Sequence, residues 1–317
     1  YNFKIKKKLK FLKIKKDFLK FNNLVKTFPL LKSYSKNYRY SYNKKIISKY
    51  KNNKNFRILG MGGSILGAEA IYQFLNEKIK KDFEFINNLN PKISIKKKAV
   101  NLIVSKSGET LETISNFHIL LKKNKNEKNI FITENKKSYL SELAYKMKSD
   151  VVEHKNFIGG RYSVLSEVGM LPAELMGLNE KKFKRLNNLI SSKRFVNQLI
   201  NNVDQILNFV KKGKLNSIIL NYDEKSENLF KWYQQLVGES LGKKSTGLIP
   251  ILSSMPKDNH SLLQLYLDGP KNNFYTFFNI YENKTDILKT NLILNSKKYL
   301  HKKSLSQIIH AQELSTQ

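Results

Sequence analysis

Short apolar runs alternate with longer segments of helical periodicity along the middle of the chain. The runs have the length and branching of buried strands, whereas the segments between them repeat apolar residues every three or four positions. The predicted strands are 56–59, 101–104, 129–133, 151–152, 215–220, 248–252 and 273–280, and the predicted helices are 65–75, 109–121, 139–147, 227–240 and one that starts at 261. Strands that alternate with helices of this length predict parallel β-α-β units, so we expect an α/β fold.

Changes in composition divide the chain into three predicted parts. Residues 1–50 are rich in Lys, and their apolar residues recur at helical intervals, which predicts an N-terminal helical segment. Those apolar residues are Leu9, Phe11, Leu12, Phe18, Leu19, Leu24 and Val25. Residues 51–185 and 186–317 should each form a subdomain in which a mostly parallel sheet lies between two layers of helices, with a helical link rich in Asn and Lys leading into the second.

The composition excludes several classes of protein. The 317 residues include no cysteine, which rules out disulfides, thiolate nucleophiles and cysteine metal sites. No apolar run approaches the roughly 18 residues that cross a bilayer. Residues 1–20 lack the continuous apolar core of a secretory signal. We therefore expect a cytoplasmic protein without a membrane partner.

The formal net charge of +33 comes almost entirely from Lys. Of the 58 basic residues, only Arg39, Arg57, Arg161, Arg185 and Arg194 are Arg. Proteins that read nucleic acids favour Arg for bidentate and stacking contacts, whereas these Lys are spread along the chain among Asn, Ile, Phe and Tyr. We expect no nucleic-acid partner, although the charge would attract anionic substrates. In this background Arg161, which follows two glycines, is a candidate for binding a planar anion.

A hydroxyl-rich turn joins the predicted strand 101–104 to the helix that follows it. The turn offers Ser105, Ser107, Thr110 and Thr113 together with the first amides of a helix. Helix N-termini carry unpaired N–H groups and a partial positive charge, so this turn is suited to hold a phosphate. An ordinary helix cap is the alternative, and it would account for one or two of the hydroxyls.

Two glycine-rich turns follow other predicted strands. In the turn 60–64 the glycines allow the backbone to approach a ligand closely. The dinucleotide spacing G-x-G-x-x-G fails there, because Ile65 stands where the last glycine belongs. The turn 159–163 displays Arg161 on a bare backbone. A tight turn and a surface turn are the respective structural alternatives.

Two further segments place a titratable side chain at a helix end. Segment 232–243 carries Glu239 near the C-terminus of a predicted helix, where a carboxylate opposes the helix dipole unless something compensates. Segment 257–264 places His260 at a helix start. A solvated Glu and a structural His are the alternatives. The other histidines, His118, His154, His301 and His310, lack comparable surroundings and receive no role.

Taken in order, these segments resemble the glucose-6-phosphate isomerase family, or phosphoglucose isomerase family, which has the sugar-isomerase fold. Its Gly-x-Gly-Gly-Ser turn is matched by 60–64, its phosphate loop by 105–113, and its Gly-Gly-Arg-(Phe/Tyr)-Ser turn by 159–163. Its Gln-x-x-x-Glu-Ser-x-Gly-Lys element is matched by 235–243, and its Asn-His element by 259–260. Five motifs in the same order make the resemblance specific.

The resemblance implies isomerisation of glucose 6-phosphate to fructose 6-phosphate through a cis-enediolate, a step of glycolysis and gluconeogenesis that needs no metal or cofactor. It implies that Glu239 moves the proton between C2 and C1, that Arg161 stabilises the enediolate, and that His260 assists ring opening. In the family's homodimer this His also completes the site of the partner subunit. The residues implied to bind the sugar phosphate are Ser105, Lys106, Ser107, Thr110, Thr113, Gly63, Ser64, Gln235 and Gly160.

The chain departs from the family's pattern at its end. Family members close with a helix whose Lys enters the active site, and no such element follows Lys284. The chain also begins with Tyr, so we expect a fragment. A sugar-phosphate sensor without catalytic activity is the alternative on the same fold, but a sensor has no need for Glu239, Arg161 and His260 together. Whether mannose 6-phosphate also reacts is left open by the sequence.

Overall fold

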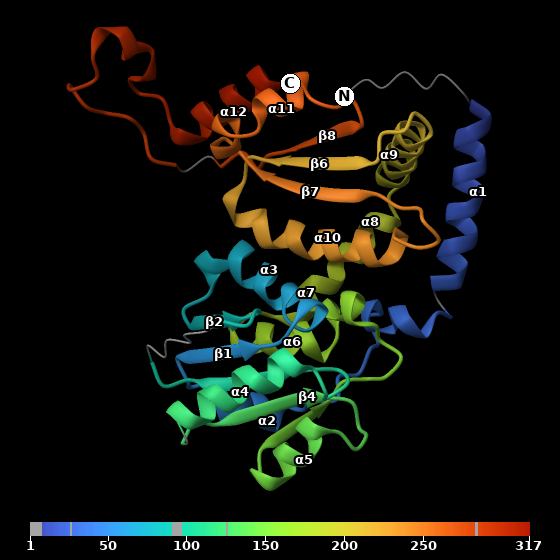
Figure 1. Cartoon of the computed structure of the whole chain (residues 1–317), viewed down its shortest axis with the longest axis vertical. Coiled ribbons are helices and arrows are strands. Elements are labelled where there is room, and N and C mark those ends of the chain that lie inside the picture. Colours follow the sequence, from blue (N-terminus) through green and yellow to red (C-terminus); the bar gives the residue numbers. More distant parts are fainter. Residues whose placement is uncertain (1–7, 26, 91–96, 125, 283–284) are drawn as a thin grey trace.

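The computed structural model describes residues 8–25, 27–90, 97–124, 126–282 and 285–317 (Figure 1). Two sheets are present in these ranges, one with the strand order β2-β1-β3-β4-β5 and one with the order β7-β6-β8, and all neighbouring strands run parallel. The strands are β1 (Asn55–Leu59), β2 (Asp82–Ile86), β3 (Val100–Val104), β4 (Asn129–Thr133), β5 (Asp150–Glu153), β6 (Asn216–Asn221), β7 (Ile249–Ser254) and β8 (Asn273–Phe278). The predicted α/β class with parallel sheets is confirmed.

Helices connect the strands and cover the sheets. They are α1 (Lys8–Val25), α2 (Lys44–Tyr50), α3 (Leu66–Phe74), α4 (Leu111–Lys123), α5 (Tyr139–Lys146), α6 (Glu167–Leu175), α7 (Glu180–Phe183), α8 (Asn187–Ile190), α9 (Lys193–Lys211), α10 (Glu227–Leu241), α11 (Leu263–Asp268) and α12 (Leu305–Thr316). Within the described ranges, no helix is both long enough and apolar enough to span a bilayer. The predicted apolar side chains of Leu9, Phe11, Leu24 and Val25 lie outside the described residues.

Three elements are absent from the predicted set, namely β2, α6 and α12. β2 is an edge strand in which Asp82 and Glu84 alternate with Phe83 and Phe85, so it lacks the continuous apolar run that marks the central strands. The helix predicted to start at 261 is only six residues long. The domain boundaries at 50/51 and 185/186 stay a prediction.

The first sheet is covered by helices on both faces. Alternate side chains of each strand point to opposite faces, so Leu102 and Val104 join one core with α3 and α6, while Ile103 joins a second core with α4 and α5. The strand order reverses direction between β1 and β3. In open parallel sheets this reversal opens a crevice at the carboxyl ends of the strands, where ligands bind.

Helix α10 lies at the junction of the two halves (Figure 1). It packs against β7 on one side and against α3 on the other. Gln73 of α3 fixes this contact, because its Nε2 donates to Glu224 O at 2.9 Å and its Oε1 accepts from Asn228 N at 2.8 Å. The second half of the chain thereby supplies side chains to the first sheet.

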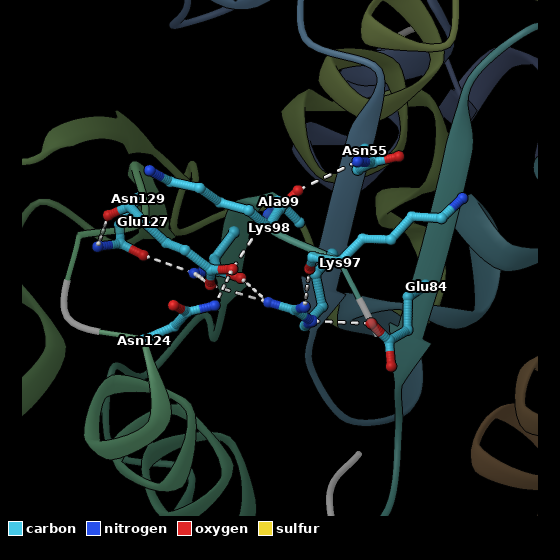
Figure 2. A network of polar contacts seen from close by, with 10 residues as sticks. Asn55, Glu84, Lys97, Lys98, Ala99, Asn124, Glu127 and Asn129 are labelled. Carbon is cyan, nitrogen blue, oxygen red and sulfur yellow. Dashed lines mark hydrogen bonds and ion pairs between the residues drawn. The ribbon is translucent and has the colours of Figure 1, made fainter. Parts of the chain in front are cut away.

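A buried polar network crosses the amino ends of the first sheet (Figure 2). Arg57 of β1 donates from Nε to Glu84 of β2 at 2.9 Å, and from Nη1 to Asn101 of β3 at 2.8 Å and to Glu127 at 3.0 Å. The side chains of Arg57 and Glu127 are each 1% exposed. Since the partners come from adjacent strands, the network fixes the strands relative to one another at the edge away from the crevice.

Candidate active site

The hydroxyl-rich turn lies at the carboxyl end of β3, beside the reversal of strand order. Ser105 Oγ lies 2.7 Å from Thr110 Oγ1 and accepts a hydrogen bond from Gly108 N at 3.2 Å. Ser107 Oγ accepts from Glu109 N at 3.1 Å. Thr110 takes the N-cap position of α4 without accepting a hydrogen bond from the helix. The ordinary-cap alternative therefore does not account for this turn, and the first amides of α4 lack a side-chain cap.

Two predicted phosphate ligands are engaged differently from the rest. Thr113 is 1% exposed within α4, and its hydroxyl has no hydrogen-bond partner among the described residues. Lys106 directs its ammonium away from the turn, because Nζ donates to Asn156 O at 2.7 Å and lies 3.6 Å from Glu134. The backbone of Lys106 is the part that stays in the turn.

The turn after β1 connects the phosphate turn to helix α10. A Cβ added at Gly60 would lie 3.1 Å from Val104 O, the last residue of β3. One added at Gly62, whose φ is +50°, would lie 2.7 Å from Gln235 Nε2 of α10. The predicted sugar-binding Ser64 ends this turn, and its Cβ is 3.0 Å from the Cβ position of Gly60. The glycines thus permit close contacts that an added side chain would force apart, and the positive φ of Gly62 favours glycine in addition.

The same turn also touches the segment that carries Arg161. A Cβ added at Gly63 would lie 2.2 Å from the carbonyl carbon of Gly160, so the two backbones are in direct contact. Ser163 Oγ reaches both carbonyls, lying 2.7 Å from Gly160 O and 3.0 Å from Gly63 O. Three motifs distant in sequence therefore meet at the carboxyl ends of β1 and β3.

Arg161 and Glu239 form an ion pair beside this junction. Arg161 Nη1 donates to Glu239 Oε2 at 2.9 Å, and Arg161 Nε donates to Ser240 Oγ at 2.9 Å. Gln235 Nε2, one turn earlier on α10, donates to Glu239 Oε1 at 2.8 Å. Glu239 lies in the last turn of α10, where these two donors compensate the unfavourable helix dipole. The side chains of Arg161 and Glu239 are 22% and 49% exposed, so the pair faces solvent.

The surroundings keep the guanidinium charged. Burial by itself would lower the pKa of Arg161, but interactions with Tyr162 and Glu239 outweigh it and raise the pKa. Burial would raise the pKa of Tyr162, yet its contacts with Ser240 and Arg161 lower it. Arg161 therefore offers a permanent positive charge within reach of a carboxylate, the combination that a base and a developing oxyanion require.

His260 is not brought to the Arg161–Glu239 pair. It ends the 3-10 helix Lys257–His260 after β7, is exposed, and makes no contact with that pair among the described hydrogen bonds and ion pairs. Asp258 fixes this turn by accepting from Ser254 N at 2.8 Å and from Ser253 Oγ at 3.0 Å.

Several residues that shape the site have no role in the sequence prediction. Ser240 holds Arg161 and also lies 3.1 Å from Tyr162 OH through its Oγ. Trp232 Nε1 donates to Arg161 O at 3.2 Å, and Ser163 joins the two glycine turns as described above. Each of these residues lies within or just before one of the five motifs. The motif alone does not predict the distant residue with which its hydroxyl or indole forms a hydrogen bond.

A family model described as phosphoglucose isomerase matches residues 31–314. The chain belongs to the phosphoglucose isomerase family. The resemblance drawn from the five motifs is confirmed.

Curated relatives in this family include three glucose-6-phosphate isomerases. The one from Methanocaldococcus jannaschii is 36% identical over 242 residues, covering 71% of this chain and 59% of the relative. The one from Campylobacter jejuni is 32% identical, covering 72% and 61%, and the one from Mycoplasmopsis synoviae is 33% identical, covering 79% and 65%. The chain thus spans about three fifths of the length of the curated relatives it matches.

Solved structures share the fold. A hypothetical protein from Thermus thermophilus superposes with a TM-score of 0.73 at 24% identity, covering 86% of this chain and 72% of that one. A glucose-6-phosphate isomerase from Chlamydia trachomatis superposes with a TM-score of 0.66 at 19% identity, covering 86% and 57%. At these identities the likeness supports the fold alone.

Proposed function

We propose that this protein interconverts glucose 6-phosphate and fructose 6-phosphate through a cis-enediolate, as the names of its relatives suggest. The observation that carries the proposal is the 2.9 Å ion pair of Arg161 and Glu239. This pair adjoins the glycine turns at the carboxyl end of β1. A helix N-terminus without a side-chain cap follows the neighbouring strand β3. An acid–base carboxylate, a fixed cation and an anion-binding turn are the parts that such a reaction needs.

The reaction requires a proton to move between two carbons of the sugar. In our proposal Glu239 removes the proton from C2 and returns it to C1, so that one carboxylate serves both halves of the reaction. Arg161 stabilises the oxygen that becomes negative in the enediolate. Because Glu239 already accepts hydrogen bonds from Arg161 and Gln235, its orientation is set before the substrate enters.

The phosphate would be held by the turn after β3. The hydroxyls of Ser105, Ser107 and Thr110 and the amides at the start of α4 are suited to its oxygens. Lys106 would contribute its backbone amide, because its ammonium is engaged elsewhere. Thr113 would support the turn from within α4.

The sugar would lie along the two glycine turns. Gly63, Ser64, Gly160 and Gln235 would line it, since the glycines leave the backbone open and Gln235 offers an amide. The exposed His260 would assist ring opening in a homodimer, where each subunit would lend this side chain to the site of the other. We place the activity in the cytoplasm, in glycolysis and gluconeogenesis.

The direct test is interconversion of the two sugar phosphates by the 317-residue chain with a metal chelator present. Turnover that resists the chelator would support the proposal, and mannose 6-phosphate would then be tried as a second substrate. A folded protein that binds fructose 6-phosphate without converting it would instead be a phosphosugar sensor.

A further inference from the structure

Residues 28–42 form an aromatic strap that runs across the back of the Arg161 turn. Three tyrosines of the strap contact one another in series: Tyr38 meets Tyr40 edge to face with ring centroids 5.3 Å apart, and Tyr40 stacks on Tyr42 with centroids 5.1 Å apart. The strap also reaches the turn directly, because a Cβ added at Gly159 would lie 3.3 Å from Leu30 Cδ1. No sequence motif predicts this contact between Leu30 and Gly159.

A fully buried carboxylate anchors the strap. Glu167 is 0% exposed at the start of α6. The Tyr38 hydroxyl donates to it and lies 2.9 Å from both of its oxygens, and Ser41 N donates to Oε1 at 3.0 Å. A buried carboxylate is costly unless donors surround it, so the position of Glu167 depends on these strap donors.

A buried ammonium completes the anchor. Lys184 is 6% exposed, and its Nζ lies 5.3 Å from the ring centroid of Tyr38 and 4.7 Å from that of Tyr40. Burial lowers the pKa of this Lys, while the carboxylates of Glu180 and Glu167 oppose the shift. The ammonium therefore lies against two aromatic faces, and the nearby carboxylates help to keep it charged.

The anchor is directly continuous with the segment that carries Arg161. The 3-10 helix Gly160–Leu165 includes Arg161 and ends at Ser166, whose Oγ donates to Ser163 O at 2.7 Å, and Glu167 follows at once. On the other side, burial raises the pKa of Tyr34 of the strap to about 12, and the charge of a deprotonated Tyr162 would raise this pKa further. The Tyr162 ring lies against Arg161, with its centroid 4.8 Å from Cζ.

We propose that Tyr38 and Glu167 are positioning residues for Arg161, because their buried hydrogen bond fixes the segment that presents the guanidinium to Glu239. The inference rests on the proposed function for its kinetic consequence. The structural consequence can be tested without the proposed function. The single Trp of the chain reports it, because Trp232 Nε1 donates to the Arg161 carbonyl.

The test compares two variants that remove the same chemical group from the same strap. Tyr38→Phe leaves Glu167 short of a donor. Tyr42→Phe removes a hydroxyl that donates to Glu174, at the far end of α6. We expect Tyr38→Phe to shift Trp232 emission to longer wavelength and to lower kcat about tenfold with KM changed less than about twofold. Tyr42→Phe should lower the Tm about as much as Tyr38→Phe does, but it should leave kcat and the Trp232 emission unchanged.

The double variant Tyr38→Phe with Glu167→Gln adds a rescue. A neutral amide tolerates the loss of a donor better than a carboxylate does, so the double variant should reverse part of the emission shift and recover part of kcat.

Equal behaviour of Tyr38→Phe and Tyr42→Phe, or normal emission in folded Tyr38→Phe, would overturn the inference. If Tyr38→Phe does not fold, the same readouts on Glu167→Met decide, because a Met side chain cannot accept the hydrogen bonds of Tyr38 and Ser41. Normal emission and normal kcat in that variant would overturn the inference. A parent protein without isomerase activity would contradict the proposed function, while the emission comparison would still test the positioning role.

Discussion

Arg161 and Glu239 lie 78 positions apart in the chain and meet in an ion pair of 2.9 Å. One comes from a glycine turn of the first sheet and the other from the last turn of α10, a helix of the second half. Each of the two charges is compensated by the other. The carboxylate opposes its own helix dipole, and the guanidinium compensates by donating a hydrogen bond to it.

Replacing Glu239 by Gln tests the base. The amide keeps the shape and can still contact Arg161 and Gln235, so the affinity for fructose 6-phosphate should change little. Isomerisation should fall by about a hundredfold to ten-thousandfold, because a placed general base contributes about 10² to 10⁴ in rate. Glu227→Gln, at the other end of α10, is the control and should retain normal turnover. Near-normal turnover in Glu239→Gln would mean that the base lies elsewhere.

Removing two hydroxyls of the phosphate turn should act first on binding. In the double variant Ser105→Ala with Ser107→Ala, the phosphate loses two donors while Glu239 and Arg161 stay in place. We expect KM to rise about tenfold or more, since a hydrogen bond to a charged group contributes about 1.5–3 kcal/mol. Steady-state kinetics measure the split. A large loss of kcat at unchanged KM would contradict the assignment of this turn to the phosphate.

The contact between the two glycine turns should tolerate no side chain. Gly63→Ala would place a methyl group 2.2 Å from the carbonyl carbon of Gly160, so the backbones must separate. We expect loss of activity and a fall of about 1–3 kcal/mol in the free energy of unfolding. Gly238→Ala is the matched control, because nothing lies within 4 Å of its added Cβ in α10. Urea denaturation should show that this control is up to about 1 kcal/mol more stable.

The network of Figure 2 should matter for stability and not for chemistry. Arg57→Met leaves Glu127 buried without its cation, which should lower the free energy of unfolding by about 3–5 kcal/mol. Adding Glu127→Gln should recover part of that loss. Turnover per folded molecule should stay normal, because the network lies at the amino ends of the strands. An Arg57→Met protein as stable as the parent would show that the network is dispensable.

His154 should make the fold sensitive to acid. Burial is the largest influence on this side chain and lowers its pKa. The folded protein therefore keeps His154 neutral at pH values where the unfolded chain binds a proton. Its contribution to stability is complete above the ordinary His pKa of about 6.5 and is lost as the pH falls from there through the lower pKa of the folded state. Denaturation of the parent and of His154→Gln between about pH 7.5 and 5 should show a shallower dependence in the variant, and equal slopes would refute this.

The sequence by itself determined the elements that are continuous in the chain. The apolar runs of β1, β3 and β4 are visible because these strands are buried on both faces, and the helices between them show their own periodicity. The five motifs indicated the family, because they occur in this sequence in the family's order. The edge strand β2 was not predicted, because polar side chains alternate with apolar ones along it.

Only the tertiary structure decided which of these segments meet. The reversal of strand order between β1 and β3 places two turns side by side, and α10 crosses to them from the second sheet. No local pattern specifies that Gly63 touches Gly160, that Lys106 turns away from its own loop, or that Tyr38 donates to a buried Glu167. These are contacts between residues far apart in sequence, and packing between whole elements sets them.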